Sequence, residues 1–370
     1  MKSKINKPLK LSFIGGGINS SIGKMHLLSS QLEKNFEIVS GFFSRNIKDN
    51  IRSQKEYIIS RDRIYNNLIE LVENEMNLVD FFVILTPTPN HFEVLKYLIS
   101  KNVNIICEKP ILSNLKEVKI IQSKLKNYKK KIYVTYNYTG YPAIREIQQI
   151  INKKKLGKLL SYNLFMTQES FLRNQSKDQK LKNWRKYDGE ISNLYLDLGI
   201  HLYNLSFFLL NIKPQSVFSD NIYYKNKLSD SKIFLNYSNG TKGLFWISKS
   251  SIGNKNDLRI ELFFENCSIK WSQNDLEFIY INLPNGSQKR IDRSVNSKVF
   301  NNNRYNRYRM GHPSGFLEAF SNIYQDIADD FLNKKNTYTF NEDNSFSGLK
   351  FLNYCEQSAK KKKLINNMIL

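Results

Sequence analysis

The apolar positions in the first part of the chain follow a regular rhythm. Short apolar runs, typical of buried strands, are separated by longer segments in which apolar residues recur every three or four positions, as in amphipathic helices. This alternation predicts a parallel, doubly wound α/β sheet. The expected strands are 10–14, 36–43, 78–87, 103–110 and 131–138, and the expected helices include 90–100, 114–126 and one that follows the glycines at 15–17.

The rhythm changes after residue 138. Later segments are rich in β-forming residues, and Asn239-Gly240 between two of them predicts a hairpin within 232–248. We therefore predict a first, doubly wound domain at 8–136 and a second, α+β domain at 137–370 with a mostly antiparallel sheet. The second domain is expected to hold helices at 142–157, 194–210 and 315–332, three strands within 258–283, and a long polar loop at 284–311.

Length and composition agree with two folded domains. The chain has 370 residues, more than one usual domain, and its 41% hydrophobic and 24% charged residues are typical of soluble globular proteins. The three cysteines lie far apart without metal-ligand spacing, which favours a reducing compartment. No apolar run is long enough for a signal peptide or a membrane helix. We therefore expect a cytoplasmic protein without a membrane partner.

The formal net charge of +23 admits two interpretations. A basic protein can bind nucleic acid, but here the lysines form short scattered runs and no nucleic-acid-binding motif accompanies them. We therefore expect a solvated basic surface with no nucleic-acid partner, which would still gather anionic small molecules. Salt-sensitive affinity for DNA or RNA would support the other interpretation.

A glycine-rich turn between the first strand and the first helix indicates a nucleotide site. Gly15 and Gly17 occupy the first two positions of the pattern G-x-G-x-x-G, and Ser20 stands at the third. In such turns the first glycine forms the bend, the second admits a pyrophosphate, and the helix N-terminus faces its charge. A plain glycine-rich turn is the alternative. We assign Gly15, Gly17, Ile18 and Asn19 to dinucleotide binding.

The end of the second strand bears on the choice of cofactor. Sites that prefer NAD usually carry an acid there, whereas this strand ends in the sequence GFFSRN. An arginine at this place can pair with a 2′-phosphate or stack on adenine. We therefore assign Ser44 and Arg45 to cofactor binding, and they favour NADP over NAD.

Lys109 precedes a proline at the end of a predicted strand, in the sequence CEKP. Open α/β sheets bind ligands at this end of their strands, and Pro110 restricts the backbone of Lys109 to extended angles. The amine could donate to a substrate oxygen and stabilise negative charge that develops during hydride transfer. An ordinary surface lysine is the alternative.

Asp197 and His201 stand four residues apart in the sequence LYLDLGIHLYNL. On an α-helix such residues share a face. A histidine with a pKa of about 6.5 can accept a proton from an alcohol, while a carboxylate fixes its tautomer or binds the substrate. A pair that only stabilises the helix is an equal alternative.

The other three histidines are expected to be structural or capping residues. His26 lies on the first helix, His91 opens the helix after the third strand, and His312 precedes the late helix. His91 is the candidate for a place near a nicotinamide. No histidine has cysteine or acidic neighbours at metal-ligand spacing, so no metal is expected.

In their order along the chain, these motifs resemble those of the Gfo/Idh/MocA oxidoreductases. The likeness rests on the glycine turn, TPTPNHFEVLKYLI, CEKP, the NY that opens the second domain, and D-x-x-x-H at Asp197 and His201. It covers nearly the whole chain, and EKP and D-x-x-x-H are its specific parts. The chain departs from the family at Ser20 and in GEISNLYLD, where relatives are glycine-rich, which indicates altered specificity.

The resemblance implies a Rossmann domain that binds NAD or NADP, and a second domain whose open sheet commonly mediates dimer or tetramer formation. Family members move hydride to or from a ring carbon of a sugar, a cyclitol or a related molecule. Carried over, Lys109, Asp197 and His201 form the catalytic set, in which Asp197 also binds the substrate. The cofactor side also includes Thr86, Pro87, Asn90, Glu108, Lys109 and Asn137, and the substrate side includes Lys109, Tyr138, Trp184, Arg185, Asp197 and His201.

We therefore expect an NAD(P)-dependent oxidoreductase that acts on a CH–OH group of a sugar, an inositol or a related polyol. The alternative is a catalytically silent sensor of the same fold that binds a dinucleotide and regulates a partner. The presence of Lys109, Asp197 and His201 favours the enzyme.

Overall fold

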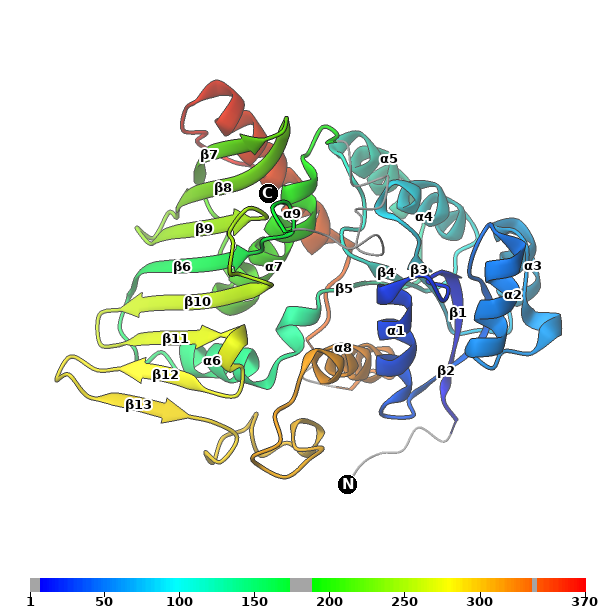
Figure 1. Cartoon of the computed structure of the whole chain (residues 1–370), viewed down its shortest axis with the longest axis horizontal. Coiled ribbons are helices and arrows are strands. Elements are labelled where there is room, and N and C mark those ends of the chain that lie inside the picture. Colours follow the sequence, from blue (N-terminus) through cyan, green and yellow to red (C-terminus); the bar gives the residue numbers. More distant parts are fainter. Residues whose placement is uncertain (1–6, 174–187, 335–337) are drawn as a thin grey trace. The chain divides into compact units, whose positions relative to one another are not determined.

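The computed structural model describes residues 7–173, 188–334 and 338–370 (Figure 1). Its contacts divide the chain into two compact units. The first contains the chain up to Gly140 together with Phe316–Phe346, and the second contains Tyr141–Gly315 together with Ser347–Leu370.

The first unit is built on a five-stranded parallel sheet, as predicted, with the order β2-β1-β3-β4-β5. Because β2 and β3 lie on opposite sides of β1, the winding reverses beside β1, which is where such sheets bind ligands. The strands are β1 (Leu9–Gly15), β2 (Phe36–Phe42), β3 (Phe81–Leu85), β4 (Ile105–Glu108) and β5 (Ile132–Thr135). The helices are α1 (Ser21–Gln31), α2 (Ile47–Glu56), α3 (Leu68–Glu75), α4 (His91–Ser100), α5 (Leu115–Leu125) and α8 (Phe316–Phe331).

Both faces of this sheet are covered. All five residues of β3 are buried, as expected for a strand with helices on both sides. On one face, Phe320, Ile323 and Ile327 of α8 join the apolar core formed by β1, β2 and β3. Helix α8 therefore packs on strands that precede it by more than two hundred residues of sequence.

The second unit contains an eight-stranded sheet with the order β13-β12-β11-β10-β6-β9-β8-β7. Every neighbouring pair is antiparallel except β6 and β9, which confirms the predicted, mostly antiparallel sheet. The strands are β6 (Leu159–Thr167), β7 (Ser216–Tyr224), β8 (Lys227–Asn236), β9 (Lys242–Ser248), β10 (Asp257–Phe264), β11 (Ser268–Ser272), β12 (Ile279–Asn282) and β13 (Gln288–Ile291). The helices are α6 (Pro142–Asn152), α7 (Ile200–Leu210) and, from Ser347 on, α9 (Glu342–Lys361).

One face of this sheet forms the core of the second unit. Residues alternate along the strands, so that Leu164 and Phe245 are buried while Phe165 and Trp246 are half-buried on the other face. The ring of Phe351 in α9 packs edge-to-face on Phe245, which places α9 on the buried face. On the other face, Phe234 of β8 is 47% exposed.

Several predicted boundaries differ from the structure, and three of the differences have a visible cause. The helix expected at 142–157 ends at Asn152, and Lys154 takes a left-handed backbone (φ 54°) that cannot continue a helix. The strand expected at 131–138 ends at Thr135, before a 3₁₀ turn at Asn137–Gly140. The loop expected at 284–311 includes β13, because polar residues can form an edge strand without a buried face.

Candidate active site

The predicted cofactor residues lie at the carboxyl ends of all five parallel strands. Because the strands are parallel, these ends share one edge of the sheet. The glycine turn follows β1, Ser44 and Arg45 follow β2, and Lys109 follows β4. Thr86, Pro87 and Asn90 follow β3, and Asn137 and Tyr138 follow β5.

The glycine turn is shaped by close backbone packing. Gly15 has a φ of +80°, and a Cβ there would lie 2.9 Å from the backbone of Leu85 and Thr86. A Cβ at Gly17 would lie 2.7 Å from the hydroxyl of Ser53, which also accepts a hydrogen bond from the amide of Ile18 at 3.0 Å. Side chains are therefore excluded from the surface of this turn, as a bound pyrophosphate requires.

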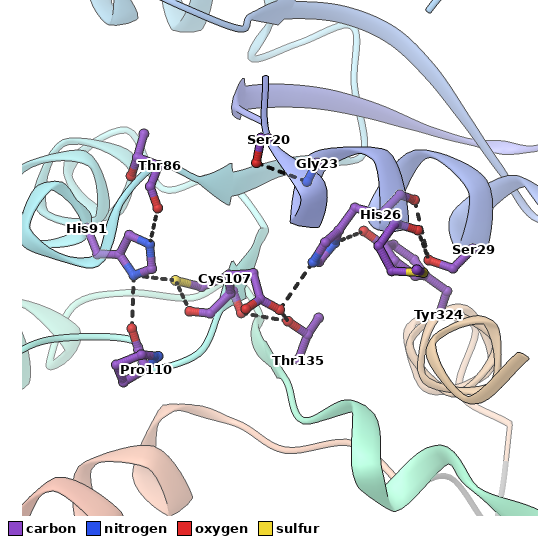
Figure 2. A network of polar contacts seen from close by, with 12 residues as sticks. Ser20, Gly23, His26, Ser29, Thr86, His91, Cys107, Pro110, Thr135 and Tyr324 are labelled. Carbon is purple, nitrogen blue, oxygen red and sulfur yellow. Dashed lines mark hydrogen bonds and ion pairs between the residues drawn. The ribbon is translucent and has the colours of Figure 1, made fainter. Parts of the chain in front are cut away.

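The third glycine of the motif is displaced along the chain. Ser20, at the third position of the pattern, is the N-cap of α1 and accepts a hydrogen bond from the amide of Gly23 at 3.1 Å (Figure 2). The residue that needs to be glycine for helix α1 to pack closely on the turn is Gly23, where a Cβ would lie 1.9 Å from the carbonyl oxygen of Gly16. The sequence contained this signal, since Gly23 follows three residues after Ser20.

The end of β2 presents an exposed arginine and no carboxylate. Arg45 is exposed, and the hydroxyl of Ser44 accepts a hydrogen bond from the amide of Asn46 at 3.1 Å. The first acid beyond the strand is Asp49, in the first turn of α2, where it pairs with Arg52 at 3.7 Å.

Two buried polar atoms at this edge have no hydrogen-bond partner in the described part of the chain. They are Oγ1 of Thr86 and Nδ2 of Asn137, and both residues belong to the predicted cofactor set. Buried polar atoms in folded proteins are normally satisfied, so unsatisfied ones are expected where a ligand completes the site. Pro87 and Asn90 are exposed beside Thr86, and Asn19 is exposed on the glycine turn.

Glu108 turns away from solvent at the end of β4. Its Oε1 accepts hydrogen bonds from Nε2 of His26 at 3.2 Å and from the hydroxyl of Thr135 at 2.6 Å. Burial alone would raise the pKa of Glu108, but these bonds, the charge of His26 and that of Lys109 together bring the pKa below its ordinary value. The carboxylate is therefore ionised and held inside the unit, while Lys109 beside it is half-buried.

In the second unit, Asp197 does not lie on a regular α-helix. Tyr195–Gly199 forms a π-helical turn that leads into α7, on which His201 lies. In a π turn, hydrogen bonds run from residue i to i+5, so a spacing of four no longer guarantees a shared face. Such turns occur frequently at functional sites.

Helix α7 is also more deeply buried than an amphipathic helix. Only Phe207 and Leu210 of its eleven residues are half-buried, and the others are buried, including His201 at 6% and Asn204 at 1% exposure. The polar residues His201 and Asn204 therefore lie in the interior. Buried polar residues need partners, which is consistent with a polar site inside this unit.

Lys249 is a candidate site residue that the sequence did not reveal. It follows β9, is almost fully buried, and places Nζ 2.7 Å from Oδ2 of Asp197. Its amine also lies 5.7 Å from the ring centre of Phe171. A single lysine after a strand carries no pattern of its own, so only the fold pairs it with Asp197.

Two predicted substrate residues, Trp184 and Arg185, lie outside the described residues. His312 is exposed, while His26 and His91 are buried. Within the described ranges, no group of three histidine, cysteine or acidic residues is placed to hold a metal. Nor does any described helix have the length and apolarity needed to cross a membrane.

Comparisons with known proteins agree with both sheets. Residues 9–136 match the model of an oxidoreductase family with an NAD-binding Rossmann fold, and residues 144–270 match the Gfo/Idh/MocA C-terminal domain. An uncharacterized oxidoreductase of Bacillus subtilis, YfiI, is 23% identical over 96% of this chain and 95% of its own length. The glucose-6-phosphate 3-dehydrogenase of the same organism is 24% identical, but over only 54% of this chain and 53% of its own length.

Solved structures share the fold over almost the whole length. An inositol dehydrogenase homologue from Azotobacter vinelandii, complexed with NADH and myo-inositol, superposes with a TM-score of 0.87 at 20% identity, with 98% of each chain covered. An oxidoreductase from Sinorhizobium meliloti gives a TM-score of 0.85 at 23% identity over 97% of this chain and all of its own. With both family domains matched in order, the chain belongs to the Gfo/Idh/MocA oxidoreductases.

Proposed function

We propose that this protein is an NAD(P)-dependent dehydrogenase that oxidises a CH–OH group of a sugar, an inositol or a related polyol, or reduces the corresponding ketone. The proposal rests on two groups of polar residues, one in each unit. The first unit gathers the glycine turn and Lys109 at one sheet edge, and the second unit holds the half-buried Asp197, on a π turn, together with the buried residues His201 and Lys249. Inositol and sugar dehydrogenases among the similar proteins support this substrate class.

The residues of the first unit fit a dinucleotide. The glycine turn offers backbone without side chains, α1 begins directly behind it, and Thr86 Oγ1 and Asn137 Nδ2 offer unused hydrogen-bonding capacity. We assign the pyrophosphate to the turn and the nicotinamide half to the ends of β3 and β5. When bound, the nicotinamide supplies the hydride acceptor or donor.

In this mechanism His201 accepts the hydroxyl proton of the substrate, while Lys109 donates a hydrogen bond to the same oxygen. Removal of the proton lets the C–H bond break with both of its electrons, so that the carbon becomes a carbonyl. Lys109 stabilises the negative charge that grows on the oxygen during this change. Asp197 accepts hydrogen bonds from substrate hydroxyls, and Lys249, whose Nζ lies 2.7 Å from Oδ2 of Asp197, holds this carboxylate in direction.

We further propose that NADP is preferred over NAD. Arg45 is exposed after β2, where a guanidinium can pair with a 2′-phosphate, and no carboxylate stands there to accept a hydrogen bond from a ribose hydroxyl. The exposed side of the eight-stranded sheet supports a proposed homodimer or tetramer, since Ile222 on β7 and Phe234 on β8 are each about half exposed.

The proposal is tested by a spectrophotometric screen of sugars, inositols and sugar acids with both nucleotides. We expect NAD(P)H formation with at least one polyol. His201→Ala should lower this rate about 100-fold or more, because a general base contributes about that much, while nucleotide affinity stays within about twofold. Nucleotide binding without any oxidation across the panel would instead favour a sensor, and wild-type turnover by His201→Ala would remove His201 from the mechanism.

A further inference from the structure

Two buried histidines of the first unit take no part in the proposed chemistry. His26 on α1 is 0% exposed and His91 at the start of α4 is 1% exposed. Both ring nitrogens of each histidine have a polar contact, and Figure 2 shows that the contacts of both lead to the segment around Cys107 and Pro110. This segment contains Lys109.

His26 holds the residue that precedes Lys109. Because a carboxylate only accepts hydrogen bonds, Nε2 of His26 donates to Glu108. The other ring nitrogen, Nδ1, lies 2.7 Å from the hydroxyl of Tyr324 on α8. The hydroxyl of Thr135 on β5 binds the same carboxylate oxygen. Three elements of the unit therefore fix the side chain of Glu108.

His91 holds the residue that follows Lys109. Its Nδ1 lies 2.9 Å from the carbonyl oxygen of Pro110, and its Nε2 lies 2.8 Å from the carbonyl oxygen of Thr86. Thr86 belongs to the loop after β3, which carries part of the predicted cofactor set. A neutral imidazole carries one N–H, so His91 donates to one of these carbonyl oxygens and packs against the other, between the lysine segment and the cofactor loop (Figure 2).

We propose that His26 and His91 are positioning residues that fix Lys109 against the nicotinamide side of the site. This inference rests on the function proposed above for Lys109. A lysine side chain is long and flexible, so the place that its amine can reach depends on how firmly its backbone is held. Misplacement of a reacting group by about 1 Å can lower a rate about 100-fold, so anchors on both sides of the lysine are consistent with such a demand.

The test replaces each histidine with a side chain of similar size that lacks its polar atoms. His91→Phe removes both carbonyl contacts, and His26→Phe removes the donor to Glu108. Because His26→Phe leaves a buried carboxylate with one donor fewer and can fail to fold, His26→Gln and His91→Gln are made in parallel. His312→Gln, at the exposed histidine, is the matched control. Thermal unfolding identifies the variants that are folded at the assay temperature.

Three quantities are measured on the folded variants: amide hydrogen exchange of the peptide spanning 105–114, the Kd for NADPH and NADH, and kcat with a substrate found in the screen. We expect His91→Phe to speed exchange in this peptide, to raise the nucleotide Kd about threefold or more, and to lower kcat about tenfold or more. His26→Phe, or His26→Gln in its place, should speed exchange and lower kcat with less effect on the Kd. The glutamine variants should be less impaired than the phenylalanine variants, and His312→Gln should match the wild type.

A merely structural role would lower thermal stability alone. Wild-type exchange in 105–114 together with wild-type kcat in folded His26 and His91 variants would overturn the inference. If the wild-type protein oxidises no substrate, the proposed function fails instead. In that case the exchange of 105–114 alone decides whether the two histidines anchor the lysine segment.

Discussion

Replacement of Lys249 by methionine tests the buried ion pair at the centre of the second unit. The amine lies 2.7 Å from Asp197, and the side chains of Lys249 and Asp197 are 5% and 25% exposed. Loss of one partner from a fully buried pair costs about 3–5 kcal/mol, because the other charge is left without a partner. A fully exposed pair contributes only about 0–1 kcal/mol. Since the Asp197 side chain is 25% exposed, the pair lies between these two cases, and we expect Lys249→Met to lower the free energy of unfolding by about 2 kcal/mol.

The assay is denaturant unfolding followed by circular dichroism, with four proteins compared. If the loss comes from an uncompensated charge, Asp197→Asn in the Lys249→Met background should restore part of the stability. Lys232→Met is the matched control, since Lys232 pairs with Asp230 at 3.3 Å but is 46% exposed, and it should cost less than about 1 kcal/mol. Wild-type stability of Lys249→Met, or a double variant no more stable than Lys249→Met, would refute the reasoning.

Four further predictions follow from single positions. Arg45→Asp should raise the Kd for NADPH about tenfold, whereas the Kd for NADH should stay the same or fall. Fluorescence titration measures both constants, and equal changes for the two nucleotides would exclude a contact with the 2′-phosphate. Gly23→Ala places a Cβ against the carbonyl of Gly16 and should lower stability by about 1–3 kcal/mol while weakening nucleotide binding. The control is Gly189→Ala, at an exposed glycine whose Cβ would have only the carbonyl oxygen of Ile191 near it, at 3.9 Å, and denaturant unfolding should show it unchanged. Burial holds the pKa of His91 in the folded protein below 6.5. As the pH falls through 6.5, His91 is therefore protonated in the unfolded chain first, and the free energy of unfolding should decline until the pH reaches the lower pKa of the folded state. Denaturation measured at several pH values should show that His91→Phe lacks this part of the decline. Phe234→Lys, on the exposed face of the eight-stranded sheet, should lower the mass measured by light scattering if that face joins subunits, and an unchanged oligomer would place the contact elsewhere.

The main elements of both sheets could be predicted because each has a local signal. β3 is a continuous apolar run, and the hairpin of β8 and β9 turns at Gly240, which has a φ of +86°. The glycine turn and the EKP motif can likewise be recognised from their residue types and their order in the sequence. Boundaries were less accurate where a local conformation, such as the left-handed Lys154, decides the end of an element.

Several parts of the site could not be predicted because they depend on contacts distant in sequence. The periodicity of α8 indicates a buried face but does not say which sheet it covers. The pairing of Lys249 with Asp197 joins residues 52 positions apart, and that of His26 with Glu108 joins residues 82 apart. The π turn under Asp197 is a backbone adjustment within a helical pattern, and no residue type marks it. The motifs therefore indicate which residues to consider, and the fold supplies their partners.

The most direct test of the mechanism is a double-mutant cycle in kcat/KM for Lys109→Met and His201→Ala, measured with the substrate found in the screen. If both residues act on the same oxygen in one step, each single variant should lose about 100-fold or more, and the double variant should be little worse than the poorer single variant. Full wild-type kcat/KM in either single variant, or losses that multiply in the double variant as they would for independent sites, would contradict a shared step.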